Sequence, residues 1–574
     1  MAPAATRLAP FPDLPIEAFL YGHEGPWPQP SRDHPFGLAP GIYQIPKEEW
    51  DDWTKNVQSY YRGNIVQFGL RAAAASVDRA LAPNEYPDVT DAEFNTLVCE
   101  GLYSKFLSKL DEHDERIFRD YITDPAYDYL KSDYSCMRVV RITHAGETVA
   151  ASVALIRRPK NDVGYHYDVI AIQLQVWDPA SGQFKESEIF TKDDKKVWPI
   201  ARLFLLQGAI HRINLIDHTE VHFPADAINA ITKTVLPKNN LVLRLMQPHM
   251  WLSLPVNNTV LEGQRSLINR NTWYMWSPFV AQGDEVRKLL PFGWFGSQYY
   301  SAELAPLEPY KDAYFDAPNS SYPPFVYDTT PPAIPSLYGE FLNAYFPPVR
   351  KFVRGVLEHM SDTDWAEIRF WAHHIAIWIP GFPTAEDLTG ADGKSRNPDV
   401  LADVLAHFIW NASVRHSADH QTLHAMIAGG VEVAGNKTPP RPVPFILRVV
   451  PPLHKNYTLE AQPVDYSKLS LVEKAEKFLE WATTKVPLCW PADLDSAYWA
   501  DLLFYQPHNS WHLTDVVADI NGDPNRCYAF ESEELKSLVQ QFHADLVALD
   551  ADLKENHVQM HFVPLTEIAS SIQY

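Results

Sequence analysis

Two long stretches of the sequence combine a helical pattern of apolar residues with pairs of histidines. They are residues 195–223 (KKVWPIARLFLLQGAIHRINLIDHTEVHF) and 397–427 (NPDVLADVLAHFIWNASVRHSADHQTLHAMI). Apolar residues that recur at helical spacing over such lengths predict two long helices in a mainly α protein. Pro224, which lacks a backbone donor and clashes with the preceding turn, predicts an end or a kink after the first stretch.

Each stretch carries two histidines four residues apart, in His218-Thr-Glu-Val-His222 and His416-Ser-Ala-Asp-His420. Residues at this spacing lie about 40° apart around a helix and about 6 Å apart along it, so both imidazoles can reach one ion. Two such helices facing each other supply four nitrogen ligands, a set suited to iron, manganese, copper or zinc. Chance pairs are common among 22 histidines, but two pairs in apolar helices favour a metal site. The zinc-protease motif H-E-x-x-H is not matched.

Other histidines fit this site less well. His211 precedes His218 by seven residues, a rise of about 10.5 Å, which is too far for both to bind one ion on a straight helix. We interpret His211 as a core or supporting residue, and the sequence leaves open whether it replaces one of the first pair. His373 and His374 are adjacent, face different ways and receive no role.

The rest of the chain predicts a helical body with a small β subdomain. Residues 1–130 are expected to form an N-terminal arm followed by helices, and residues 131–574 the main domain. A small sheet is expected at about 135–190, where β-branched runs such as CMRVVRI (136–142) and YDVIAIQLQVW (167–177) are separated by turn-like segments.

Charge and composition exclude some functions. The 49 basic and 72 acidic side chains give a net charge of −23, which repels a phosphate backbone, so nucleic acid is not an expected partner. The four cysteines are far apart and indicate neither a disulfide framework nor a thiolate zinc site. We find no signal peptide and no apolar run of about 18 residues, so we expect a cytoplasmic protein without a transmembrane segment. Export as a mature form stays open.

Several short motifs resemble those of the lipoxygenases, from about Tyr167 to the end of the chain. The segment Ile409-Trp410-Asn-Ala-Ser-Val-Arg-His416 is similar to the family's I-W-x-A-S-x-x-H and is the most specific match. The other matching segments are Trp198-Pro-Ile-Ala201-Arg202, Leu245-Met-Gln-Pro248-His249, Arg265-Ser-Leu-Ile-Asn269, Asp364-Trp-Ala-Glu367-Ile-Arg-Phe-Trp371, Asn436-Lys-Thr-Pro-Pro-Arg441 and the terminal Ser571-Ile572-Gln573-Tyr574.

This resemblance implies a lipoxygenase-like helical catalytic domain without the N-terminal β-barrel of many members. It implies one iron ion per chain, with manganese as the other possibility. The ligands would be His218, His222, His416, His420 and the terminal carboxylate of Tyr574. The implied reaction is the oxidation of a polyunsaturated fatty acid by O2. A metal-bound hydroxide would remove a hydrogen atom from a doubly allylic carbon, and the product would be a hydroperoxide. No protein base is assigned.

The resemblance also places Leu267, Asn269 and Arg270 in the substrate pocket. Arg270 stands where members usually carry Ala or Gly, at a position tied to product stereochemistry. A cation there favours a second function, an oxygenase acting on another unsaturated metabolite with an acidic group that pairs with Arg270. Two more functions stay open. A non-catalytic lipid-binding relative would bind lipid but no metal, and a zinc hydrolase would hold zinc and consume no O2.

Overall fold

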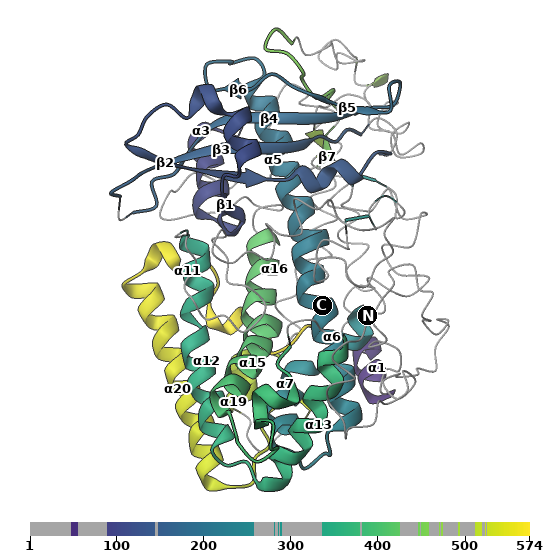
Figure 1. Cartoon of the computed structure of the whole chain (residues 1–574), viewed down its shortest axis with the longest axis vertical. Coiled ribbons are helices and arrows are strands. Elements are labelled where there is room, and N and C mark those ends of the chain that lie inside the picture. Colours follow the sequence, from purple (N-terminus) through teal and green to yellow (C-terminus); the bar gives the residue numbers. More distant parts are fainter. Residues whose placement is uncertain are drawn as a thin grey trace.

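The computed structural model has a sheet at one end and a helical body at the other (Figure 1). Helix α5 (Trp198–Arg212) packs on strands β3 (Ala151–Pro159) and β4 (Asp168–Asp178) and continues toward the helical body. The mainly α fold with a small sheet is confirmed. The structure describes residues 47–55, 89–143, 147–162, 164–257, 280–281, 285, 288–289, 334, 336–378, 382–424, 446–447, 449–457, 470, 472–473, 492–493, 511–518, 523 and 525–573.

The main sheet has six strands, and every pairing between them is antiparallel. Five strands follow the order β1-β2-β3-β4-β5, while β6 pairs with β4. A separate pair joins β7 (Ile446–Leu447) to β8 (Ala492–Asp493). The six strands are β1 (Leu107–Lys109), β2 (Tyr127–Asp133), β3 (Ala151–Pro159), β4 (Asp168–Asp178), β5 (Gln183–Glu186) and β6 (Phe190–Thr191).

The sheet begins earlier in the chain than the sequence indicated, because β1 and β2 both lie entirely before residue 135. Polar residues in β2 obscure the pattern of apolar residues by which a strand is recognised in a sequence. Its Lys131 is buried among the carboxylates of Asp111, Asp114 and Asp133. The strand predicted at 136–142 was wrong, since residues 135–139 form a 3-10 turn with three consecutive buried side chains, a burial pattern that a half-buried strand does not have.

The helices of the body follow the expected apolar spacing. In α12, Val349, Phe352, Val353 and Val356 are buried on one face. This face packs between α15 and α20, and the Phe352 ring stacks on Phe542 of α20 with centroids 4.4 Å apart. The remaining helices are α1 (Lys47–Trp53), α3 (Asp91–Asn95), α4 (Glu112–Ile117), α6 (His218–Val235), α7 (Leu241–Met250), α8 (Ser253–Asn257), α11 (Leu337–Ala344), α12 (Phe346–Leu357), α13 (Asp362–Trp378), α14 (Ala385–Thr389), α15 (Pro398–Trp410), α16 (His416–His424), α19 (Leu513–Ala518) and α20 (Glu533–Glu555).

Side-chain caps fix where several of these helices begin. Asn240 accepts hydrogen bonds from Val242 N and Leu243 N at the start of α7. Ser336 and Ser532 cap α11 and α20 in the same way. Each cap satisfies a backbone donor that has no partner within the helix. Among the helices in the described part of the chain, none is both long enough and apolar enough to cross a bilayer.

The expected end of the helix at Pro224 was wrong, because α6 runs from His218 to Val235. The alternative, a kink at Pro224, stays a prediction. A proline removes one hydrogen bond from the ladder, yet tertiary packing retains the helix around it. Val221, Ala225 and Ile228 on either side of the proline are buried. The second histidine-bearing stretch is helical from Pro398 to His424, as predicted.

Candidate metal centre

Both histidine-bearing helices contain a π-helical segment directly before their histidines. The first π segment, Ile213–Asp217, separates α5 from α6, and the second, Asn411–Arg415, separates α15 from α16. His218 and His416 each donate a backbone hydrogen bond to a carbonyl five residues back, on Ile213 and Asn411. Such single-turn π segments within α-helices occur frequently at functional sites.

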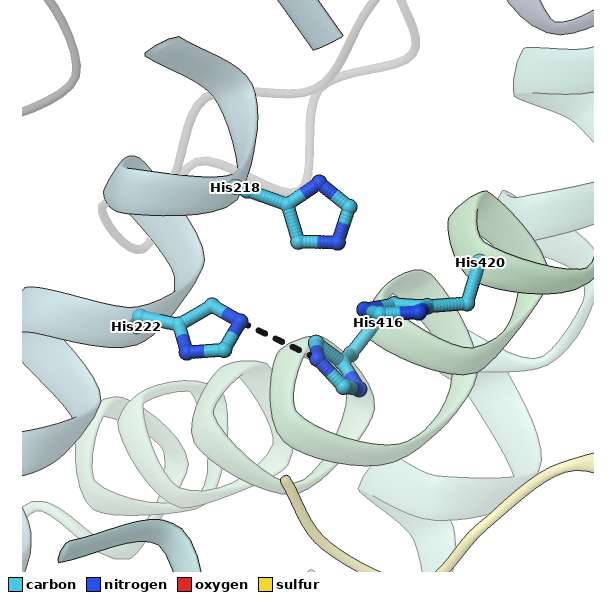
Figure 2. Close-up of side chains that lie close together, drawn as sticks. All are labelled: His218, His222, His416 and His420. Atoms are coloured by element: carbon cyan, nitrogen blue, oxygen red, sulfur yellow. Dashed lines mark hydrogen bonds between the residues drawn. The ribbon is translucent and has the colours of Figure 1, made fainter. Parts of the chain in front are cut away.

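The two histidine pairs meet where α6 and α16 face each other. Figure 2 shows the four imidazole rings of His218, His222, His416 and His420 pointing toward one another. One ring nitrogen from each residue lies within 4.8 Å of the others. The Nε2 atoms of His222 and His416 are 3.1 Å apart and share a hydrogen bond between the two helices (Figure 2). The structure therefore brings together all four histidines that the spacing singled out.

Burial keeps the imidazoles of His218 and His416 in the neutral form that binds metal ions. All four side chains are less than a tenth exposed. Loss of hydration, with smaller contributions from neighbouring histidines, lowers the pKa of His218 to about 3 and that of His416 well below its ordinary value. Both rings are therefore neutral at physiological pH, and a neutral imidazole nitrogen is the donor that iron, manganese, copper and zinc accept. The donor set fits a transition-metal ion.

A backbone carbonyl orients His218. Its Nδ1 atom lies 3.0 Å from the carbonyl oxygen of Ile213, and an oxygen acceptor there requires the proton on Nδ1. Nε2 then carries the lone pair. A metal-binding histidine is commonly held in this way, because a hydrogen bond on one nitrogen fixes both the tautomer and the ring plane.

Charged residues that the sequence analysis missed lie directly beside the histidines. Asp217, Arg415 and Asp419 precede His218, His416 and His420 in the chain, and all three are buried with Lys105. Burial raises the pKa of Asp419 to about 7, although Lys105 opposes it. At Asp217, Arg415 and Lys105 outweigh the effect of burial and lower the pKa. The sequence did contain a signal for these residues, namely charged side chains inside otherwise apolar helices.

The C-terminal tail runs inward beside α16. Residues 568–573 are buried, and Ala569 N donates to Ser417 Oγ at 2.9 Å, next to His416 in the chain. Ser571 Oγ donates to the Trp251 carbonyl at 2.7 Å, while Gln573 bonds the backbone of Trp511. Tyr574 lies outside the described residues, so its predicted role as a ligand remains a prediction.

His211 lies outside the group of four histidines, which answers the question that the sequence left open. Its Nε2 accepts a hydrogen bond from Val280 N at 3.2 Å, and its Nδ1 donates to the Gln207 carbonyl at 2.9 Å. His373 and His374 are buried on α13 and do not join the group either. The predicted pocket residues Leu267, Asn269 and Arg270 lie outside the described residues.

Known proteins resemble this chain in fold rather than in sequence. No family model matches it, and no curated protein matches it by sequence. Among solved structures, a lipoxygenase variant in complex with arachidonate has a TM-score of 0.60 and 15% identity, covering 96% of this chain and 79% of its own. Coral 8R-lipoxygenase has a TM-score of 0.60 and 13% identity, with 97% and 80% covered.

Manganese lipoxygenase of Gaeumannomyces graminis also superposes on this chain, with a TM-score of 0.56 and 13% identity, covering 92% of this chain and 91% of its own. Sequence identities this low are informative about architecture alone. The similarity extends over nearly the whole of this chain in each comparison. The chain therefore has the lipoxygenase fold.

Proposed function

We propose that this protein is a non-haem metal dioxygenase that inserts O2 into a polyunsaturated fatty acid. The observation that carries the proposal is the buried group of four histidines on two π-interrupted helices. The lipoxygenase fold supports it, since related folds in the comparison include a complex with arachidonate and a manganese enzyme.

The protein's own contribution is to hold four imidazole nitrogen donors together in a buried site. His218, His222, His416 and His420 are the proposed metal ligands, and the Ile213 carbonyl fixes the tautomer of His218. An iron or manganese ion held by these residues would supply the one-electron chemistry needed to remove a hydrogen atom from the substrate.

The terminal carboxylate of Tyr574 is the proposed fifth ligand. The tail supports this assignment because it is buried up to Gln573 and bonds to Ser417, one residue after His416. An anionic oxygen beside four nitrogen donors would complete a ligand set that suits iron or manganese. Leu267, Asn269 and Arg270 remain the proposed pocket residues, with Arg270 the position at which a substrate carboxylate would pair.

Oxygen consumption by metal-loaded protein tests the proposal. The protein is loaded with Fe(II) or Mn(II), its metal content is measured, and O2 uptake is followed with linoleate. We expect about one ion per chain, uptake that depends on linoleate, and loss of both in His222→Ala. His211→Gln is the matched control, because His211 is a buried, neutral histidine of the same helical stretch outside the group.

Each rival function predicts a different result. Bound iron or manganese without uptake on linoleate contradicts the fatty-acid substrate and points to another unsaturated metabolite. Lipid binding by protein that retains no metal identifies a non-catalytic carrier. Retention of zinc, with no uptake in any metal form, supports a hydrolase instead.

A further inference from the structure

Three of the four histidines directly follow a residue of one buried charge network. Asp217 Oδ1 accepts a hydrogen bond from Arg415 Nη2 at 2.7 Å, and these two residues are the last of the first and second π segments. Lys105 Nζ contacts the other oxygen of Asp217 and lies 2.7 Å from Asp419 Oδ2. The side chains of all four residues are at most 2% exposed.

Two further bonds fix the orientation of this network. The hydroxyl of Tyr338 on α11 donates to Asp419 Oδ1 at 2.9 Å. Arg415 Nη1 donates to Asn411 Oδ1 at 3.1 Å, so the arginine is held within its own π segment. Both oxygens of each carboxylate are thereby bonded, which restricts the carboxylate planes as well as their positions.

Lys105 comes from a separate part of the chain. It lies on the 3-10 turn Leu102–Phe106, more than a hundred residues before the first histidine. This turn is itself anchored, because Ser104 Oγ bonds the Gly101 carbonyl at 2.6 Å and Ser336 Oγ at 2.7 Å. The ammonium group is therefore delivered from a fixed turn to two carboxylates on two different helices.

The arrangement connects the lysine to the histidines through single peptide units. A displacement of Asp217 moves His218, and a displacement of Asp419 moves His420, because adjacent residues share a backbone. Buried ion pairs contribute little net stability compared with apolar residues of similar size, since desolvation offsets their attraction. Such a network can instead hold the residues it connects in a specific geometry.

We propose that Lys105 is a positioning residue for the metal site: by bridging Asp217 and Asp419, it sets the separation between the histidine pair of α6 and that of α16. The inference rests on the metal site put forward under the proposed function. It assigns Lys105 no contact with the ion or the substrate. Its effect is on how tightly and in what geometry the four imidazoles bind a metal.

Cobalt(II) binding tests this role without requiring catalysis. Its visible absorption bands report coordination geometry, and competition with a chelator gives the dissociation constant. In Lys105→Met we expect weaker binding by about 10- to 100-fold, the range seen when residues that orient ligands are removed, together with altered bands. Lys105→Met also leaves the buried Asp419 carboxylate without its cation, whereas Asp217 keeps Arg415. Lys105→Met/Asp419→Asn is therefore included to remove one charge of each sign.

Lys131→Met is the matched control. Lys131 is also a buried lysine that bridges carboxylates, on β2 of the sheet, and it lies outside the network at the histidines. We expect its cobalt affinity and spectrum to match wild type. The folded double variant should bind weakly with altered bands. Wild-type affinity and bands in that variant, or its failure to fold, would overturn the proposal.

The outcome separates this inference from the proposed function. Wild-type protein that binds cobalt(II) but consumes no O2 in its iron or manganese form contradicts the dioxygenase and leaves the role of Lys105 standing. Wild-type protein that binds no cobalt(II) overturns the role of Lys105.

Discussion

His249 Nδ1 lies 2.7 Å from the carbonyl oxygen of Ser570, so helix α7 holds the C-terminal tail by a side-chain hydrogen bond. The second ring nitrogen, Nε2, lies 2.5 Å from the hydroxyl of Tyr528. Nδ1 must donate to the carbonyl, so Nε2 accepts from the tyrosine. Burial lowers the pKa of His249 to about 4, which keeps the ring neutral and both bonds in place.

We expect His249→Phe to lower the free energy of unfolding by about 2–6 kcal/mol. The substitution retains a ring but leaves the Ser570 carbonyl and the Tyr528 hydroxyl buried without their partner, at about 1–3 kcal/mol for each group. Urea unfolding measures the change. Tyr528→Phe breaks only one bond and should lower the free energy by less. Equal losses in the two variants would contradict the anchoring of the tail by His249.

Deletion of Tyr574 should weaken metal binding while leaving the fold intact. The tail remains attached because Ala569, Ser571 and Gln573 keep their bonds, but the terminal carboxylate moves back by one residue. Tyr574→Ala is the control, since it changes the side chain and retains a carboxylate at the same position. Metal content and circular dichroism are the measurements. Equal metal content in the deletion, the control and wild type would rule out a terminal ligand.

The stability of the metal-free protein should fall with acidification in part because of His211. Burial lowers its folded-state pKa to about 4 from an ordinary 6.5, so only the unfolded chain takes up this proton between those values. The stability lost from pH 7 to pH 5 is about 2 kcal/mol for such a group. His211→Gln cannot take up the proton and should lose that much less. Carboxylate effects cancel in the comparison of the two unfolding series.

Gly208→Ala should destabilise the protein by about 1–3 kcal/mol. A Cβ atom at this position of α5 would lie 2.6 Å from Tyr134 Cβ, so the helix would have to move off the sheet. Gly355→Ala on α12 is the control, because the nearest atoms belong to the flexible Leu538 side chain at 3.2 Å. We expect that variant to stay within about 1 kcal/mol of wild type in thermal or urea unfolding. Similar losses at both positions would disprove the close approach at Gly208.

The local parts of the candidate site were predictable from the sequence. The spacing of His218 and His222, and of His416 and His420, places each pair on one side of a helix whatever the rest of the fold does. The mainly α class was predictable for the same reason, because apolar periodicity is a local signal. The structure brings the two pairs together. Their meeting depends on contact between two helices that lie almost two hundred residues apart in the sequence.

Long-range contacts account for what the sequence did not predict. In the sequence, Lys105 looks like an ordinary surface lysine. Only the fold brings Asp217 and Asp419 beside it. Lys131 made β2 hard to recognise in the same way, since its buried charge is compensated mainly by Asp111 and Asp114 from an earlier segment. Helix α6 continues through Pro224 because tertiary packing outweighs the local cost of a proline in a helix. A short stretch of sequence carries no information about that packing.

The π segments have a consequence for how such a site can arise and be lost. Each residue advances an α-helix by about 100°, so one extra residue before His218 and another before His416 rotate everything that follows by that angle. Removing one residue from either segment would let it close as an α-helix and would turn intact histidines away from their partners. The number of residues in each π segment is thus as important for forming the site as the identity of the ligands. Histidines that occupy the same place in two distantly related structures can therefore require a gap in the alignment of the two sequences.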